Sequence, residues 1–455
     1  MGMSLFVKTI SFILLPIYAS VLTVEDYGKL ATIESLLRFA PVVFSLSIES
    51  SIYRYYHDKS TCNGKLISTS ILFILLNSFT MTIIAYILIY SGKIPKIHNY
   101  EYILILTAIS SCIAQISIIF IAELKAKVLA KDVAIYTSVL SIVAFLFTIY
   151  FLYVFNVSWL SRLYAYLVAV IVQLICLIVF FKREPILINR PSFNILKKQL
   201  KYSLPLFPSV ISIWALALFD RLYLQYLGMP ESVGIYSMAV QIALIMYIVQ
   251  DSILQVNSPK LMKSLINSTL NKVEQKKFFE RFIVFLLGLN LFVAFFQEYA
   301  FMIFMSPQYY ESMIYIPFLM FMHILRGWNR YIYVYLSFEN RTSYIGILGI
   351  FQVIVIGLLN YFYFPVYGVK FTIFSSGIVL LSVTLLLAKD FLKYGIDVNF
   401  RKIFLATALI GMCSIVSIFH SYSVDYKFDL IVFFIKILSL FSLILIFYYI
   451  FWKRR

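Results

Sequence analysis

Long apolar stretches, separated by short polar segments, make up almost the whole chain. Fourteen of them have roughly the 20 mostly apolar residues that an α-helix needs to cross a bilayer. They cover residues 3–22, 29–53, 66–90, 101–123, 132–155, 159–181, 201–225, 233–256, 281–304, 312–336, 343–363, 369–388, 403–420 and 429–451. Because these runs are apolar on every face and do not alternate, they predict helices and not barrel strands.

The composition supports the same fold class. Of 455 residues, 62% are hydrophobic and 13% are charged, and the mean hydropathy is +0.91. Soluble domains are about half apolar and about a quarter charged. We therefore expect an all-α integral membrane protein with about 14 transmembrane helices. Lys8 lies inside the first stretch, so we interpret that stretch as a helix and not as a cleaved signal peptide.

The distribution of basic residues predicts the orientation in the membrane. If both termini are cytoplasmic, the inner loops and the C-terminal tail hold 26 lysines and arginines, and the outer loops, with Arg162 among them, hold 6. Cytoplasmic loops are the ones enriched in basic residues. The net charge of +17 is thus mainly a topology signal, and its spread over seven segments argues against a nucleic-acid partner. Four widely spaced cysteines suggest no metal site.

The loops are short, and two of the turns resemble each other. The sequence LTVEDYG ends at Gly28, and LGMPESVGIY contains Gly234, which is 206 residues or six helices later. Either two short turns are alike by chance, or the chain holds two six-helix lobes inserted in the same orientation. On the second reading, residues 1–182 and 183–390 form the lobes and 391–455 add two helices. No loop has room for a catalytic domain, so an enzyme is not expected.

Charged residues within the predicted spans are the main functional clues, because burying a charge in a bilayer costs about 3 kcal/mol even on a lenient scale. Glu34 and Arg38 lie at i and i+4 and can pair along one helix face, either as a structural tie or with Arg38 in a cavity. Asp220 and Arg221 lie near the outer end of their helix, from where Arg221 can also extend to the interface.

The tenth stretch carries the richest set of polar residues. His323, Arg326, Gly327 and Arg330 fall on one helical face, which we expect to line a hydrated and positively charged cavity. Arg330 also lies close enough to the cytoplasmic side to extend there. Asp251 either binds a coupling cation or pairs with an arginine. Since arginine binds phosphate in a bidentate fashion, the expected cargo is anionic and carries phosphate.

Several segments resemble the Wzx-type polysaccharide flippases of the multidrug/oligosaccharidyl-lipid/polysaccharide (MOP) exporter superfamily. They are KTISFILLPIY at 8–18, LTVEDYG at 22–28, Arg54, FDR at 219–221 and VGIYS at 233–237. The resemblance implies a MOP/MATE-like pair of six-helix lobes plus two helices. It also implies flipping of undecaprenyl-pyrophosphate-linked oligosaccharide for O-antigen, capsule or exopolysaccharide synthesis, by alternating access in a bacterial cytoplasmic (inner) membrane.

On this reading the substrate-binding residues are Arg38, Arg221, Arg326, Arg330 and His323, and the ion-coupling residues are Glu34, Asp220 and Asp251. A proton or sodium gradient replaces any cofactor. The protein acts as a monomer among membrane lipids, and a polysaccharide polymerase or other assembly proteins are its expected partners. Two alternatives remain: a MATE-like drug or cation antiporter, whose cavity should be acidic, and a multi-spanning polymerase or ligase, which needs a large outer loop.

Overall fold

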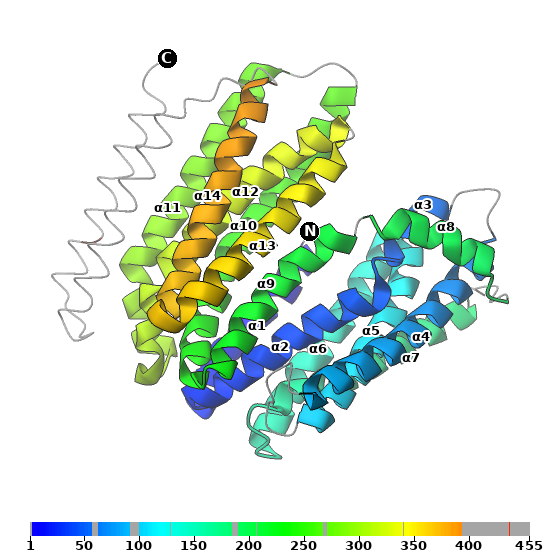
Figure 1. Ribbon diagram of the computed structural model, residues 1–455, viewed down its shortest axis with the longest axis horizontal. Coiled ribbons are helices and arrows are strands. Elements are labelled where there is room, and N and C mark those ends of the chain that lie inside the picture. Colours follow the sequence, from blue (N-terminus) through cyan, green and yellow to red (C-terminus); the bar gives the residue numbers. More distant parts are fainter. Residues whose placement is uncertain are drawn as a thin grey trace. The chain divides into compact units, whose positions relative to one another are not determined.

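The computed structural model describes residues 2–56, 62–91, 100–127, 129–183, 190–205, 207–266, 271–339, 341–393 and Lys436 (Figure 1). These residues form long helices joined by short connections. In chain order the helices are α1 (Gly2–Val21), α2 (Val24–Ser45), α3 (Glu49–Tyr55), α4 (Asn63–Tyr90), α5 (Tyr100–Ala126), α6 (Ala130–Tyr153), α7 (Ser161–Arg183), α8 (Phe193–Ser203), α9 (Phe207–Tyr226), α10 (Pro230–Ile266), α11 (Lys272–Phe304), the 3₁₀ helix η1 (Pro307–Ile314), α12 (Ile316–Phe338), α13 (Thr342–Tyr367) and α14 (Val369–Lys393).

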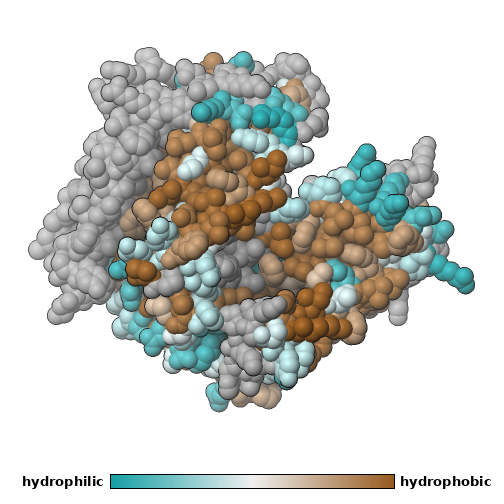
Figure 2. Space-filling model, in the orientation of Figure 1, coloured by the Kyte–Doolittle hydropathy of each residue, from teal (hydrophilic) through white to brown (hydrophobic). Residues whose placement is uncertain are grey.

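The all-α membrane fold is confirmed. Each of the first twelve predicted stretches overlaps one long helix, and eight helices in the described part are long and apolar enough to cross a membrane. In the face shown in Figure 2, apolar residues cover most of the long helices, and hydrophilic residues gather near helix ends. The predicted helices at 403–420 and 429–451 lie outside the described residues, apart from Lys436, whose ammonium group pairs with buried Glu298.

Local sequence explains where the helices begin. Thr23 precedes α2, and its hydroxyl accepts a hydrogen bond from the Asp26 amide at 3.2 Å. Asn271 does the same for α11, where its side-chain oxygen accepts from Val273 and Glu274. Such caps satisfy amides at a helix start that have no partner within the helix.

The second predicted stretch, 29–53, is not one helix. α2 ends at Ser45 and α3 begins at Glu49, and Leu46 and Ser47 between them have φ angles of 46° and 61°. Neither residue is a glycine, for which this left-handed conformation would be easy. The hydrophobic pattern continues across the break, so it gave no sign of it.

The segment 182–200, predicted as a loop, contains most of the short helix α8. Ile195 and Leu196 on one side of α8 pack against a buried cluster of α3, α4 and α5 residues, and Lys197 on the other side is exposed. Gln199 is fully buried and donates hydrogen bonds to Ser51 at 3.1 Å and Ser70 at 2.7 Å. With 11 residues α8 is too short to cross a bilayer, and its two faces suit a helix lying at the interface.

The chain folds into two compact units. Residues 1–234 and 349–357 form the first unit, and residues 235–348 and 358–455 form the second. In the first unit, α7 packs along α6 and α5, and α2 packs along α5 and α9. In the second, α12 packs against α11 and α14. The lobe boundaries at 182 and 390 stay predictions.

The two glycines of the similar turns lie against each other in the first unit. A Cβ atom on Gly28 would stand 2.3 Å from the Pro230 oxygen and 3.0 Å from the Gly234 nitrogen. A Cβ on Gly234 would stand 2.0 Å from the Val24 oxygen. The starts of α2 and α10 therefore touch backbone to backbone, and only glycine fits at either position.

This contact gives a prediction for stability. Gly28→Ala and Gly234→Ala should each destabilise the protein by about 1–3 kcal/mol, because the new methyl group meets backbone atoms that cannot move aside. Gly288→Ala on α11 is the matched control, since nothing lies within 4 Å of its added Cβ. Titration with a denaturing detergent measures the unfolding free energy, and equal stability of all three variants would contradict the close packing.

Candidate functional site

A carboxylate held by two arginines is the polar centre of the first unit. Glu34 Oε1 accepts a hydrogen bond from Arg162 Nε on α7 at 3.0 Å. Its other oxygen, Oε2, lies 3.9 Å from Arg38 Nη2, one turn further along α2. The i, i+4 pairing of Glu34 with Arg38 is thus confirmed. The Glu34 and Arg162 side chains are only 14% and 18% exposed, whereas that of Arg38 is 43% exposed.

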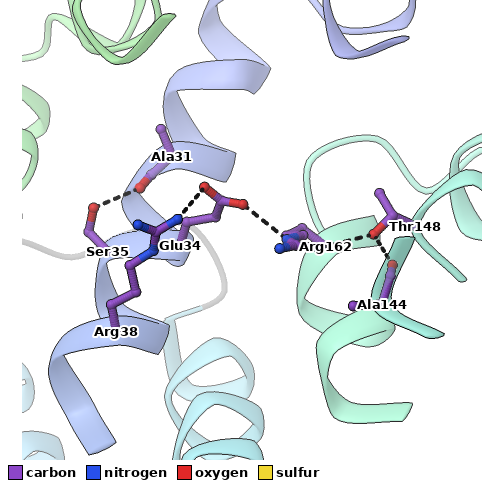
Figure 3. Close-up of polar contacts among 7 residues, drawn as sticks. All are labelled: Ala31, Glu34, Ser35, Arg38, Ala144, Thr148 and Arg162. Atoms are coloured by element: carbon purple, nitrogen blue, oxygen red, sulfur yellow. Dashed lines mark hydrogen bonds and ion pairs between the residues drawn. The ribbon is translucent and has the colours of Figure 1, made fainter. Parts of the chain in front are cut away.

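A third helix orients Arg162. Thr148 on α6 accepts a hydrogen bond from Arg162 Nη1 at 3.5 Å and donates its own to the Ala144 carbonyl at 2.6 Å (Figure 3). Figure 3 shows the Glu34 carboxylate between the two guanidinium groups. Arg162 is thereby held from two sides, and Arg38 is the more accessible cation of the pair.

Arg221 is a further buried arginine of the first unit. It lies on α9, which packs along α2. Asp220 and Arg221 are each only 7% exposed, so Arg221 does not extend to the interface as an exposed side chain.

The second unit has a polar centre of its own between α10 and α12. Arg330 Nη2 donates to Asp251 Oδ1 at 2.7 Å, and the guanidinium carbon lies 5.6 Å from the ring centre of Tyr247. The two helices come close at Gly327, where a Cβ atom would meet the Gln250 side-chain oxygen at 2.3 Å. Of the two readings for Asp251, the structure shows the pairing with an arginine.

The predicted stripe on α12 divides into buried and accessible parts. His323 is 7% exposed, and its ring centre lies 6.1 Å from that of Tyr247. Arg326, near the middle of α12, is exposed, and the Arg330 side chain is 38% exposed. The two arginines are therefore accessible from the same side of α12, while His323 belongs to the packed interior. Within the described residues, no group of three or more His, Cys, Asp or Glu side chains could hold a metal ion.

Arg162 is the site residue that the sequence analysis missed. Its place at the start of an apolar stretch assigned it to an outer loop, but it lies in the first turn of α7 and binds Glu34. A lone arginine at a predicted helix end is the pattern of an interfacial residue. Only the packing of α7 beside α2 brings it to a carboxylate 128 positions earlier.

The sequence matches the family described as Polysaccharide biosynthesis protein over residues 1–265, more than half of the chain. The chain belongs to this family. The match spans the whole of α1–α9 and most of α10, and so it contains the Glu34 centre and Asp251. No curated protein sequence matches this member of the family.

Solved structures with the same fold are transport proteins. The chain is similar to the lipid II flippase MurJ in an inward closed conformation, with a TM-score of 0.73, 14% identity, and coverage of 99% of this chain and 98% of the other. For an inward-facing multidrug resistance MATE family transporter of the MOP superfamily the TM-score is 0.65 at 13% identity, with 90% and 95% coverage.

A MOP superfamily transporter from Pyrococcus furiosus gives a TM-score of 0.54 at 15% identity, covering 90% of this chain and 94% of that one. At these identities the likeness concerns the fold. The family member described here therefore has the all-α MOP transporter fold predicted from its sequence.

The Glu34–Arg162 pair gives a prediction for stability. Arg162→Ala should lower the unfolding free energy by about 3 kcal/mol, because it leaves a buried carboxylate with weaker compensation. Arg38→Ala should cost less, since Arg38 is more exposed and its contact is longer. In a double-mutant cycle, Glu34→Gln should recover part of the Arg162→Ala loss. Additive effects of the two substitutions would contradict the pairing.

Proposed function

We propose that this protein moves a lipid-linked oligosaccharide with a diphosphate headgroup from the inner to the outer leaflet of a bacterial cytoplasmic membrane. The single observation that carries the proposal is the pair of arginines, Arg38 and Arg162, on the one Glu34 carboxylate inside the helical bundle of the first unit. The family and the fold support transport during polysaccharide biosynthesis.

Placing arginine inside a membrane has a free-energy cost. Charged side chains within spanning helices face the bundle interior or water, because acyl chains cannot solvate them. Arg38 is accessible and stands well inside α2, as Arg326 does in α12. Each unit thus offers an accessible cation at a depth where lipid is a poor solvent, which favours a hydrated face.

The positive charge of these faces indicates which cargo they would bind. Guanidinium groups bind phosphate oxygens through paired, charge-assisted hydrogen bonds. Arg38 and Arg162 place two guanidinium groups on the single Glu34 carboxylate. A diphosphate diester, which links the lipid carrier to the glycan in undecaprenyl-pyrophosphate precursors, matches this excess. We assign Arg38 and Arg221 in the first unit, and Arg326 and Arg330 in the second, as residues that each bind anionic groups of the cargo.

The remaining roles follow the same reading. Flipping proceeds by alternating access and uses a proton or sodium gradient. The coupling role of Glu34, Asp220 and Asp251 stays a prediction, as does the contact of His323 with cargo. Action as a monomer, both termini in the cytoplasm, and a polymerase as partner in O-antigen, capsule or exopolysaccharide assembly also stay predictions.

A drug or cation antiporter with the same fold is the runner-up, and the structural likeness to a MATE transporter speaks for it. Its cargo is cationic, so its accessible buried charges should be acidic. Glu34 and Asp251 each bind an arginine. Arg38 and Arg326, by contrast, are exposed and positively charged. The polarity therefore favours the anionic cargo.

The test is transport by arginine variants in a host that lacks its own flippase. Arg38→Ala and Arg326→Ala should each reduce surface polysaccharide at least tenfold at normal protein level, because each removes a phosphate donor. Arg38→Lys should retain part of the activity, since it keeps the charge and loses the bidentate geometry. Arg190→Ala, an exposed arginine before α8, is the control and should export normally.

Normal export of polysaccharide by both alanine variants would contradict the proposed anionic cargo. A direct binding measurement sharpens the test: purified protein should bind geranylgeranyl pyrophosphate, and Arg38→Ala should weaken that binding. Preferential binding of cationic dyes over the pyrophosphate probe would instead favour the antiporter.

A further inference from the structure

At the break between α2 and α3, the last four carbonyls of α2 all accept hydrogen bonds, which distinguishes it from a frayed helix end. The last four carbonyls of a helix have no donor within that helix. At the end of α2, Leu46 N–H donates to the Val42 carbonyl at 3.1 Å, and Ile48 N–H donates to the Ser45 carbonyl at 2.9 Å. Leu46 and Ser47 have positive φ angles, and this left-handed conformation forms the tight turn between α2 and α3.

The other two carbonyls are satisfied from a neighbouring helix. Asn77 on α4 donates through Nδ2 to the Val43 carbonyl at 3.0 Å and to the Phe44 carbonyl at 2.8 Å. Asn77 stands near the middle of a 28-residue helix that is otherwise strongly apolar. In a bilayer each unsatisfied carbonyl is costly, so the amide of Asn77 makes this break tolerable.

Because all four carbonyls of α2 have donors, they are not arranged to hold a cation. Broken membrane helices that bind ions leave backbone carbonyls for the ion. Here the carbonyls are taken by the protein itself. The last four carbonyls of α2 are therefore engaged within the protein.

The two sides of the break have different partners: α2 packs along α5 and α9, whereas α3 packs against α5 and α8. α3 is fixed: Ile48 and Ile52 are fully buried, Gln199 donates to Ser51, and Tyr56 donates to Glu123 at 3.3 Å. α2, on the other side, carries Glu34 and Arg38 and contains Pro41, which removes one further backbone hydrogen bond a few residues before the break.

We propose that the Leu46–Ser47 break is a hinge, on which the Arg38-bearing part of α2 turns relative to the block of α3, α4 and α8. Asn77 is the positioning residue of this hinge. Its role in cargo movement rests on the proposed function, since the turning segment carries a proposed headgroup ligand. The hinge itself does not depend on the identity of the cargo.

Substitutions of Asn77 distinguish the effect of its N–H donors from the effect of its side-chain size and shape. Asn77→Asp is isosteric and, when ionised, has no donor, and Asn77→Leu is of similar size and apolar. Both should lower the maximal transport rate at least tenfold, with binding of the pyrophosphate probe within twofold of the original protein. Asn77→Gln keeps both N–H donors and should recover most of the rate. Thr80→Val is the matched control, because Thr80 is exposed and bonds to the Leu76 carbonyl of its own helix.

Cysteine labelling tests the proposed hinge motion in the absence of cargo. In a protein whose four cysteines are replaced by serine, a cysteine at Ala40 reports on α2 and one at Ser50 reports on α3. Asn77→Asp should change the rate of maleimide labelling at position 40 at least threefold and leave position 50 unchanged. An unchanged rate at position 40 overturns the hinge, as does equal loss of rate, probe binding and protein level in every Asn77 variant.

Substitutions at the break itself give a second, independent probe. Leu46→Gly should transport normally, because glycine adopts the left-handed conformation without strain. Leu46→Ile has the same size but is branched at Cβ, which disfavours positive φ, and should transport at least tenfold more slowly. Equal transport by both variants overturns the proposal. If the arginine variants leave probe binding intact while labelling still responds to Asn77, the cargo assignment fails and the hinge stands.

Discussion

Polar groups inside hydrocarbon must find their partners within the protein, and this constraint governs the structure at every level. It explains why the chain is helical, since a helix satisfies its own backbone. It also explains the places where side chains take over that task. Asn77 donates to two carbonyls at the end of α2, and Gln199 ties α8 to its neighbours through buried hydroxyl groups.

The same constraint applies to the charged side chains. Inside α2 and α12, a guanidinium group is stable only beside a carboxylate or water. Glu34 and Asp251 each bind one arginine closely, at 3.0 Å and 2.7 Å, and these pairs hold their units together. Arg38 and Arg326 are more exposed than Glu34 and Asp251. The proposed negatively charged cargo rests on these exposed arginines and not on the fold, because one fold can serve proteins with different cargo.

The arrangement on α2 connects these features. Near the start of α2, Gly28 packs against the backbone at the start of α10. The middle of α2 carries the Glu34 and Arg38 pair, and its end is the hydrogen-bonded break before α3. Each feature belongs to the first unit and each constrains how α2 can move. If Arg38 binds cargo and the break is a hinge, as proposed, one helix would link binding to movement, which a transport cycle requires.

The sequence by itself determined the membrane class, the twelve long helices of the described part and the cationic character, because hydrophobic length and charge are properties of single segments. It also identified Glu34 with Arg38, since i, i+4 neighbours are local. Only the tertiary structure decided that Arg162 completes this centre, that His323 is buried, and that α2 stops at Leu46. These depend on which helices pack side by side, and an apolar pattern that is alike on all faces does not specify its neighbours.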